Sequence, residues 1–475
     1  MRAITPQERH EKMTKTPIPK LVTSMALPAM ASQIVNLIYN TADTYFVGKI
    51  SDSASAAVGV NLPLSTLIAA VGCGFAMGAS SLISRRLGAK KNEEAHLYGS
   101  SAVAINTLVG ILLMVLGLLF LQPMVRLFGS TESMMADACG YARWILLAAP
   151  FYCMEWALNM ILRAEGSATY AMLGITSGGL LNVALDPLFI FALRMGAEGA
   201  ALATAISQVL SCTVLVIPFF RGKTIVKLRP RYVSLKISDY LLLIKTGIPT
   251  VFRQGLATLA MALLNNQAKN TAFTLGAAQG ITGAARDALA EASIAGMSIA
   301  NKLYMWVRNL VLGVGQGFQP VAGYNYGSKN YGRVRGAFWF ACFMGTCLCL
   351  VASGIMLLFP EQLVSIFRDS PEVIKAGSTA LKLSAVSLPL LAYSTFVNQM
   401  YQCLGYAGQA TLLASCRQGI FYVPAVLLLP RFFGMLGLAA TQPVADLATF
   451  LVSLPFQMYF FKKVLKRMEQ LPAEA

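Results

Sequence analysis

One glycine-rich segment occurs twice in this chain: residues 74–90 read GFAMGASSLISRRLGAK, and residues 313–329 read GVGQGFQPVAGYNYGSK. A shift of 239 residues superimposes three glycines and the closing lysine, and the same shift aligns a proline and an asparagine that lie inside apolar runs. The pairs are Gly74/Gly313, Gly78/Gly317, Gly88/Gly327, Lys90/Lys329, Pro150/Pro389, Asn159/Asn398 and Gly166/Gly405. Such self-similarity predicts a duplicated fold.

The composition indicates that the duplicated chain is a membrane protein. The chain of 475 residues is 56% hydrophobic and 12% charged, with a mean hydropathy of +0.60. A soluble domain carries about 25% charged residues, so an ordinary cytosolic enzyme, a disordered chain and a secreted disulfide scaffold are excluded. The net charge of +17 would suggest nucleic acid in a soluble protein. Here the basic residues stand in short clusters between apolar runs, which is typical of membrane proteins, so no nucleic-acid partner is expected.

Twelve apolar runs are long enough to cross a bilayer, which takes about 20 residues each. Continuous apolar runs, without the alternation of barrel strands, predict helices. The predicted spans are approximately 21–47, 56–81, 97–122, 138–163, 169–193, 197–220, 240–268, 290–319, 335–358, 378–401, 411–433 and 434–462. The second half is longer by the polar, Ala- and Gly-rich stretch 267–293.

Lysine and arginine clusters predict the orientation and the division of the chain. They occur in the first twenty residues, at 85–91, 221–236, 329–335 and 462–467, all on one side of a twelve-span arrangement. The positive-inside rule therefore places both termini in the cytoplasm. We expect a tail (1–20) without a signal peptide, an N-lobe (21–220), a basic cytoplasmic linker (221–239), a C-lobe (240–462) and a second tail (463–475).

Six spans in each half give the halves the same orientation, so the repeat is parallel. Parallel repeats related by an axis along the membrane normal are typical of transporters with alternating access. The alternative is a duplicated scaffold without transport. The prediction is an all-α integral membrane protein, with two six-helix lobes related by a pseudo-two-fold axis.

Several motifs resemble the multidrug and toxic compound extrusion (MATE) family, over nearly the whole chain from about residue 20 to 465. They are Asn36-Leu-Ile-Tyr-Asn-Thr-Ala-Asp43, Arg163-Ala-Glu-Gly166, Asn182-Val-Ala-Leu-Asp186, Gly199-Ala-Ala-Leu-Ala-Thr204, Gly313-Val-Gly-Gln-Gly-Phe-Gln-Pro320 and Gly323-Tyr-Asn-Tyr-Gly327. The resemblance implies a V-shaped, MATE-like exporter in the cell membrane. It would move amphipathic, mostly cationic drugs or toxic compounds outward in exchange for Na⁺ or H⁺, with no other cofactor.

Four polar residues of the first lobe are predicted to share one depth in the membrane: Asp43, Asn182, Asp186 and Thr204. Asn182 and Asp186 are four residues apart and therefore face the same side of a helix. Two carboxylates, an amide oxygen and a hydroxyl suit a small hard cation such as Na⁺. Alternatively, two like charges at close range let one carboxylate keep a proton. The resemblance assigns the coupling cation to these same positions, and it adds Tyr141, which we expect to hydrogen-bond Asp43.

In the second lobe, the acids that some family members carry in spans seven and ten are absent. The acid that remains, Asp446, is predicted to pair with Arg417 as a structural contact. This departure concentrates the coupling prediction on the first lobe.

Glu155 has no acidic counterpart in the repeat and stands beside Trp156. A lone acid next to an aromatic ring suits an organic cation, although a salt bridge to Arg163 or Arg143 is an equal alternative. The other substrate-cavity candidates are amides, for which interhelical hydrogen bonding is the alternative: Asn36, Asn40, Gln316, Gln319 and Asn398. Pro28 lacks a backbone donor within span one and is the predicted hinge.

Three other functions compete with drug export. A flippase or exporter for lipid-linked precursors or other metabolites would share the fold, but it usually has a strongly basic cavity and extra helices. An intramembrane enzyme is disfavoured because His10 and His96 both lie in polar segments. A passive channel would show no dependence on a cation gradient. The nine cysteines are predicted to be small buried hydrophobic residues, and we expect a monomer.

Overall fold

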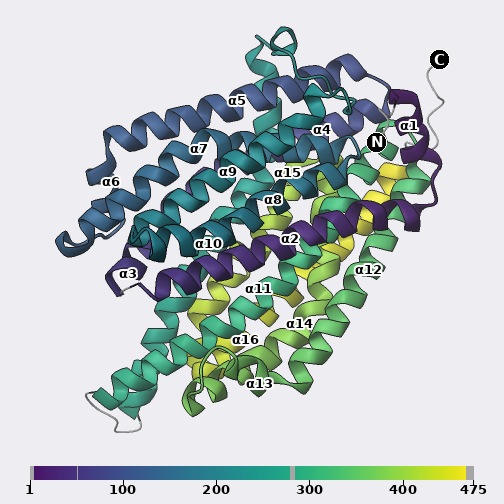
Figure 1. The fold of residues 1–475 in the computed structure, drawn as a ribbon. Helices are drawn as coiled ribbons and strands as arrows, with labels where there is room; N and C mark the ends of the chain where they lie inside the picture. The colour runs from purple at the N-terminus through teal and green to yellow at the C-terminus, as the bar shows by residue number, and fades with distance from the viewer. Residues whose placement is uncertain (1–4, 51, 279–283, 467–475) are drawn as a thin grey trace. The chain divides into compact units, whose positions relative to one another are not determined.

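The computed structural model describes residues 5–50, 52–278 and 284–466, and no strand occurs among them (Figure 1). The first half contains α1 (Pro6–Lys15), α2 (Ile18–Gly48), α3 (Asp52–Val60), α4 (Leu62–Gly88), α5 (Asn92–Leu119), α6 (Leu121–Leu127), α7 (Met135–Ala164), α8 (Ala168–Pro187) and α9 (Gly196–Phe220). The second half contains α10 (Ile237–Ala278), α11 (Ala284–Gly327), α12 (Tyr331–Leu358), α13 (Pro360–Ser365), α14 (Pro371–Cys403), α15 (Ala407–Ser415) and α16 (Tyr422–Tyr459). Short π-helical turns at Leu188–Ala192, Cys416–Ile420 and Phe460–Leu465 continue α8, α15 and α16.

Within the described residues, ten helices are long and apolar enough to cross a membrane. One of them, Ala407–Leu465, is 59 residues long and holds two of the predicted spans. Gly434 interrupts it with φ 57° and ψ −134°, at the predicted boundary between spans eleven and twelve. The predicted eighth span corresponds to α11, which is 44 residues long but not apolar enough in composition to count among the ten. The all-α, multi-pass membrane architecture is confirmed.

The backbone repeats the pattern that the sequence predicted. Lys90 and Lys329 take positive φ angles of 60° and 59°, and Gly166 and Gly405 take 88° and 91°. A left-handed conformation is rare for lysine, so the same exception at both copies marks equivalent turns. Hydrogen bonds repeat as well: the Asn159 Nδ2 donates to the Ala171 carbonyl at 3.0 Å, and the Asn398 Nδ2 to the Ala410 carbonyl at 2.6 Å.

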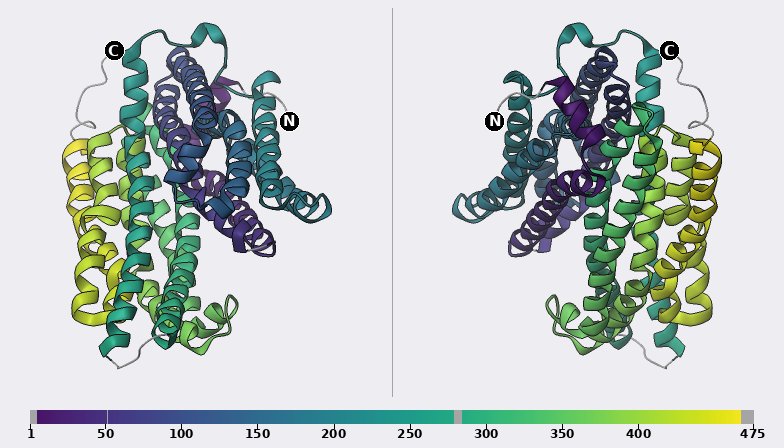
Figure 2. Two further views of the ribbon diagram at one scale, coloured as in Figure 1. Left: turned by 90° about the vertical axis from the view of Figure 1, so that its left-hand side faces the viewer. Right: turned by 90° about the vertical axis from the view of Figure 1, so that its right-hand side faces the viewer.

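Two compact units divide the chain. Unit 1 comprises Met1–Val251, Gln316–Val334 and Cys403–Gly405, and unit 2 comprises Phe252–Gly315, Arg335–Gln402 and Tyr406–Ala475. In unit 1, α7 packs against α4, α5 and α9, and α8 packs against α2 and α9. In unit 2, α12, α14 and α16 run side by side (Figures 1 and 2).

Glycines let helices of unit 1 approach one another closely. A Cβ atom added at Gly78 would overlap the backbone carbonyl of Leu243, and one added at Gly88 would overlap that of Tyr324. Small residues at such crossings supply the van der Waals packing that holds membrane helices together.

Gly78→Ala is therefore expected to destabilise the protein by about 1–3 kcal/mol, because the added methyl group overpacks a backbone contact. The matched control is Gly59→Ala, in α3, where a Cβ atom has no neighbour within 4 Å. That change should be neutral or stabilising by up to about 1 kcal/mol. Thermal unfolding of the purified variants measures both, and equal melting temperatures would contradict the packing argument.

The predicted N-terminal tail forms a docked helix. The Arg9 guanidinium is buried and donates to the Gly166 carbonyl at 2.9 Å and to the Ser167 hydroxyl at 3.0 Å. The Met13 carbonyl accepts from Asn325 Nδ2 at 3.1 Å, and the His10 ring lies 5.5 Å from the Tyr324 ring. α1 thus ties the first half of the sequence to the C-terminal end of α11, within unit 1.

Docking of α1 is expected to weaken in acid. Burial, followed by the positive charge of Lys90, lowers the pKa of His10 below its ordinary value of 6.5. Because the docked helix then binds fewer protons than the free helix, the contribution of neutral His10 to docking is fully present above pH 6.5 and is lost progressively as the pH falls below it. The protection factors of the α1 amides, each the ratio of the intrinsic to the observed exchange rate at the same pH, should be lower at pH of about 5 than at about 7.5. The variant His10→Gln should show no such difference; equal protection factors in the unmodified protein at the two pH values would contradict the prediction.

Candidate functional site

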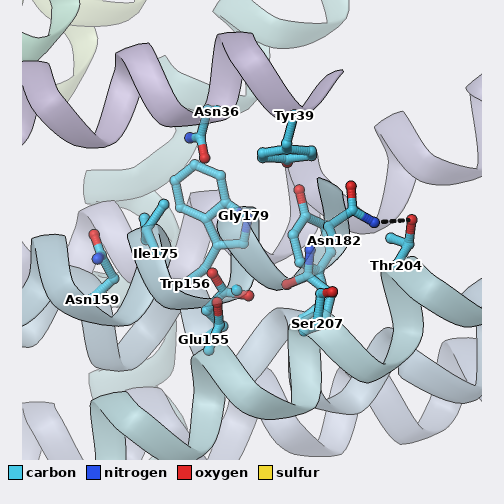
Figure 3. Close-up of a pocket in the computed structure, with 14 residues that line it drawn as sticks. Asn36, Tyr39, Glu155, Trp156, Asn159, Ile175, Gly179, Asn182, Thr204 and Ser207 are labelled. Atoms are coloured by element: carbon cyan, nitrogen blue, oxygen red, sulfur yellow. Dashed lines mark hydrogen bonds between the residues drawn. The ribbon is translucent and has the colours of Figure 1, made fainter. Parts of the chain in front are cut away.

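A polar cavity lies among α2, α7, α8 and α9 of unit 1 (Figure 3). Its volume is about 60 Å³. Asn36 and Tyr39 line it from α2, Glu155 and Trp156 from α7, and Asn182 from α8. The remaining lining residues are Tyr152, Asn159, Ile175, Gly178, Gly179, Thr204, Ser207, Gln208 and Ser211. Gly178 and Gly179 keep α8 close to its neighbours, since a Cβ atom at either would meet Ser211 or Val35.

Asn182 joins the predicted coupling residues. Its Nδ2 lies 3.4 Å from the Asp186 Oδ1 and 3.3 Å from the Thr204 Oγ1, and Figure 3 shows the second of these contacts. Asp186 is fully buried, and its carboxylate lies within electrostatic range of Asp43 on α2. Tyr141, also buried, lies within range of both acids. The structure therefore brings all five predicted coupling residues together.

One predicted contact is wrong. Tyr141 makes no hydrogen bond to Asp43 in the described part of the chain, and the Asp43 Oδ1 atom is buried without any hydrogen-bond partner. The sequence placed the two side chains at one depth, but a hydrogen bond depends on side-chain direction, which depth does not determine.

Unpartnered oxygen atoms surround this region. Around the cavity and the neighbouring acids, six oxygen atoms on five types of side chain are buried without a hydrogen-bond partner: Asp43 Oδ1, Glu155 Oε2, Asn182 Oδ1, Asp186 Oδ2, Ser207 Oγ and Gln208 Oε1. A buried acceptor without a donor raises the free energy of the folded protein. A bound cation or added protons would give these six oxygen atoms the partners that the protein does not supply. Oxygen donors of this kind match a hard cation. Within the described residues, no three His, Cys, Asp or Glu side chains gather as a metal site.

Glu155 lines the cavity beside Trp156. The salt bridge to Arg163 or Arg143, which was the alternative role for Glu155, is not formed in the described chain. Arg163 instead donates from Nε to the Asn159 Oδ1 at 2.8 Å. The cavity therefore holds a buried acid without a basic partner.

The other substrate-cavity candidates separate into two groups. Asn36 lines the cavity, whereas Asn40 is exposed and donates to the Asn36 carbonyl at 2.6 Å. Gln316, Gln319 and Asn398 do not line it. Asn398 makes the hydrogen bond to Ala410 that was the alternative for it, while Gln316 Oε1 and Gln319 Nε2 are buried without a partner.

Sequence reasoning missed Tyr39, Tyr152, Ser207 and Gln208. Ser207 and Gln208 follow Thr204 by three and four residues, the spacing that puts side chains on one helix face. Tyr39 lies within the motif that carries Asp43, four residues before it. Helical spacing from Thr204 and from Asp43 could therefore have predicted that Ser207, Gln208 and Tyr39 line the same cavity.

Pro28 lies inside α2, which continues through it as one 31-residue helix. The Ser32 hydroxyl donates to the Pro28 carbonyl at 3.0 Å. The hinge role of Pro28 stays a prediction.

In unit 2, the predicted pair is confirmed. The Arg417 Nε donates to the Asp446 Oδ1 at 2.9 Å. Tyr304, which sequence reasoning did not include, donates to the Asp446 Oδ2 at 2.5 Å and accepts from Arg417 Nη2 at 2.6 Å. Protein donors engage both oxygen atoms of this acid, whereas Asp43, Glu155 and Asp186 of unit 1 each have one buried oxygen atom without a partner.

Comparisons with known proteins agree with this architecture. The MatE family model matches residues 28–188 and 286–428. The multidrug export protein MepA of Staphylococcus aureus is 24% identical over 437 residues, covering 91% of this chain and 92% of MepA.

Solved structures are similar over the whole length. The crystal structure of MATE in complex with MaL6 has a TM-score of 0.88 at 25% identity and covers 96% of this chain and 99% of that chain. An outward-facing conformation of a multidrug resistance MATE family transporter of the MOP superfamily has a TM-score of 0.88 at 24% identity, covering 98% and 100%. Because the family model matches well over half of the chain, across both repeats, the chain belongs to the MatE family and is a multi-pass membrane transporter of the MATE type, not an enzyme.

Proposed function

We propose that the protein is a secondary active antiporter of the cell membrane. It exports amphipathic, mostly cationic drugs or toxic compounds in exchange for Na⁺ or H⁺ by alternating access. Both termini lie in the cytoplasm, and one chain suffices. The multidrug export activity named for the MepA relative supports the substrate class.

The observation that carries the proposal is the set of buried oxygen atoms without donors around Asp43, Asn182 and Asp186. Ionisable side chains inside a membrane are expensive and are retained for a function. A sodium ion would take the carboxylate, amide and hydroxyl oxygens as ligands, and a proton would be shared between the two carboxylates. Either cation supplies the positive charge that the surrounding protein does not.

The size of the cavity supports a cation site. About 60 Å³ holds a few water-sized particles, whereas drug-sized ligands need about 300 Å³ or more. The cavity therefore fits a coupling ion and its water in this conformation, and a drug binds in another one.

The exchange follows from differential affinity, since a ligand shifts a conformational equilibrium only if it binds one state better. A cation entering from outside removes one negative charge from the pair Asp43 and Asp186 and changes the packing of α2, with Pro28 as the hinge. Bound drug leaves outward. After the return inward, the cation dissociates into the cytoplasm and Glu155 with Trp156 receives the next organic cation through charge and cation–π contact.

Purified protein in proteoliposomes tests this function, with ethidium as the transported cation and Na⁺ and pH gradients imposed separately. We expect ethidium movement to follow one of the two gradients and to stop when that gradient is collapsed. Glu155→Gln should weaken ethidium transport while leaving the choice of driving ion unchanged. Ethidium movement that is independent of both gradients would show a passive channel and contradict antiport.

A further inference from the structure

Unit 2 contains a second polar site whose charge is opposite to that of the first cavity. Residues of α10, α11, α16 and the turn before α16 surround a small pocket, among them Asn301, Tyr304, Arg308, Gln418 and Gln442. Arg417 lies next to it through its hydrogen bond to Tyr304. Where unit 1 presents buried acids, unit 2 presents half-buried guanidinium groups.

Asp446 cannot serve both arginines. Its Oδ1 accepts from Arg417 Nε at 2.9 Å and from Gln442 Nε2 at 3.0 Å. Its Oδ2 accepts from Tyr304 Oη at 2.5 Å and from Ser387 Oγ at 3.1 Å. A carboxylate offers about four acceptor positions, so this one is saturated.

Arg308 is the group left over. Its Nε is buried and has no hydrogen-bond partner, and no acid forms a salt bridge with it in the described part of the chain. Arg417 lies within electrostatic range and carries the same charge, and Arg253 adds a third guanidinium nearby. Asp446 is also within electrostatic range of Arg308, but its oxygen atoms already accept four other hydrogen bonds. A cation inside the membrane needs a reason, and Arg308 has no acid of its own in the described chain.

We propose that this pocket, formed around Arg308 with Gln418 and Gln442 beside it, binds the carboxylate of an organic anion. The guanidinium donates charge-assisted hydrogen bonds, which are short and strong when a carboxylate oxygen accepts them. The free space is about 10 Å³, close to one water-sized particle. It therefore admits one oxygen of the carboxylate at a time, while the apolar remainder of the ligand stays outside. Transported compounds would then include carboxylates as well as cations.

Binding of fluorescein to the purified full-length protein, followed by fluorescence polarisation, tests the proposal without requiring transport. Rhodamine 6G is the cationic comparison probe: it shares the xanthene ring system, but its carboxylate is esterified and its amino groups carry a positive charge. Arg308→Gln should weaken fluorescein binding by about tenfold or more and leave rhodamine 6G binding unchanged. Arg431→Gln, an exposed arginine of the same unit, should change neither.

Competition on the unmodified protein covers the case in which the Arg308 variant does not fold. Benzoate should displace fluorescein, and benzyl alcohol should not. Vesicles of anionic phospholipid test the other source of anionic groups, and displacement by them alone would overturn the proposal. So would fluorescein binding that is undetectable, that persists in a folded Arg308→Gln protein, or that falls in parallel with rhodamine 6G binding. These outcomes concern binding and are independent of whether ethidium export follows a cation gradient.

Discussion

Asp43→Asn is expected to reduce cation-driven export by up to about 100-fold, the range of a coupling free energy of a few kcal/mol, without reducing the amount of protein in the membrane. The substitution keeps the shape of the side chain and removes its charge. Asp43 Oδ1 is buried without a hydrogen-bond partner, so the fold loses no contact there. What is lost is one of the two charges that attract the coupling ion. Ethidium efflux from cells or proteoliposomes, normalised to membrane protein, measures the effect.

Asp137→Asn is the control for this change. Asp137 lies in the first turn of α7, in the same unit, and is exposed. Its export should match that of the unmodified protein. Asp43→Asn protein that exports at the normal rate would remove Asp43 from the mechanism, whereas loss of export in both variants would indicate a general effect of charge.

The largest effect on stability is expected from breaking the pair of Arg417 and Asp446. Arg417→Met leaves a fully buried carboxylate without its cation, and removing one partner of a buried pair costs about 3–5 kcal/mol. Asp446→Leu leaves the Arg417 guanidinium without its acid and also removes the acceptor for Tyr304 and Ser387. Both single variants should unfold at lower temperature than the unmodified protein.

The double variant separates the pair from its surroundings. Replacing both partners with apolar residues leaves no unpaired charge, so Arg417→Met with Asp446→Leu should be more stable than either single variant. Arg368→Met, at an exposed arginine of unit 2, serves as the control. Additive losses in the double variant would show that the two side chains do not stabilise each other.

The features that the sequence predicted correctly depend on hydrophobic length, on depth in the membrane and on charge. Helix positions follow from the length of apolar runs, and the duplication follows from aligned residues such as Lys90 and Lys329, whose backbone conformations agree. The grouping of Asp43, Asn182, Asp186 and Thr204 followed from depth and helical spacing. The Arg417–Asp446 pair followed from depth and opposite charge.

The features that escaped prediction depend on side-chain direction and on competition between partners. Arg163 bonds Asn159 instead of Glu155, because the asparagine lies one helical turn away on the same face. Tyr304 completes the Asp446 cluster from a distance of 142 residues, and no local pattern marks it. The docking of α1 rests on Arg9 reaching the carbonyl of Gly166, a contact that a polar, basic tail does not reveal in its sequence.

Cation binding by the purified protein, measured directly, tests the central claim. Equilibrium binding of ²²Na⁺ and the release of protons on adding Na⁺ or substrate should reveal one saturable site in the unmodified protein and in Asp137→Asn. The same measurements should show that site lost in Asp43→Asn and in Asp186→Asn. Unchanged ion binding and proton release in both of those variants would contradict the assignment of the coupling ion to this pair of acids.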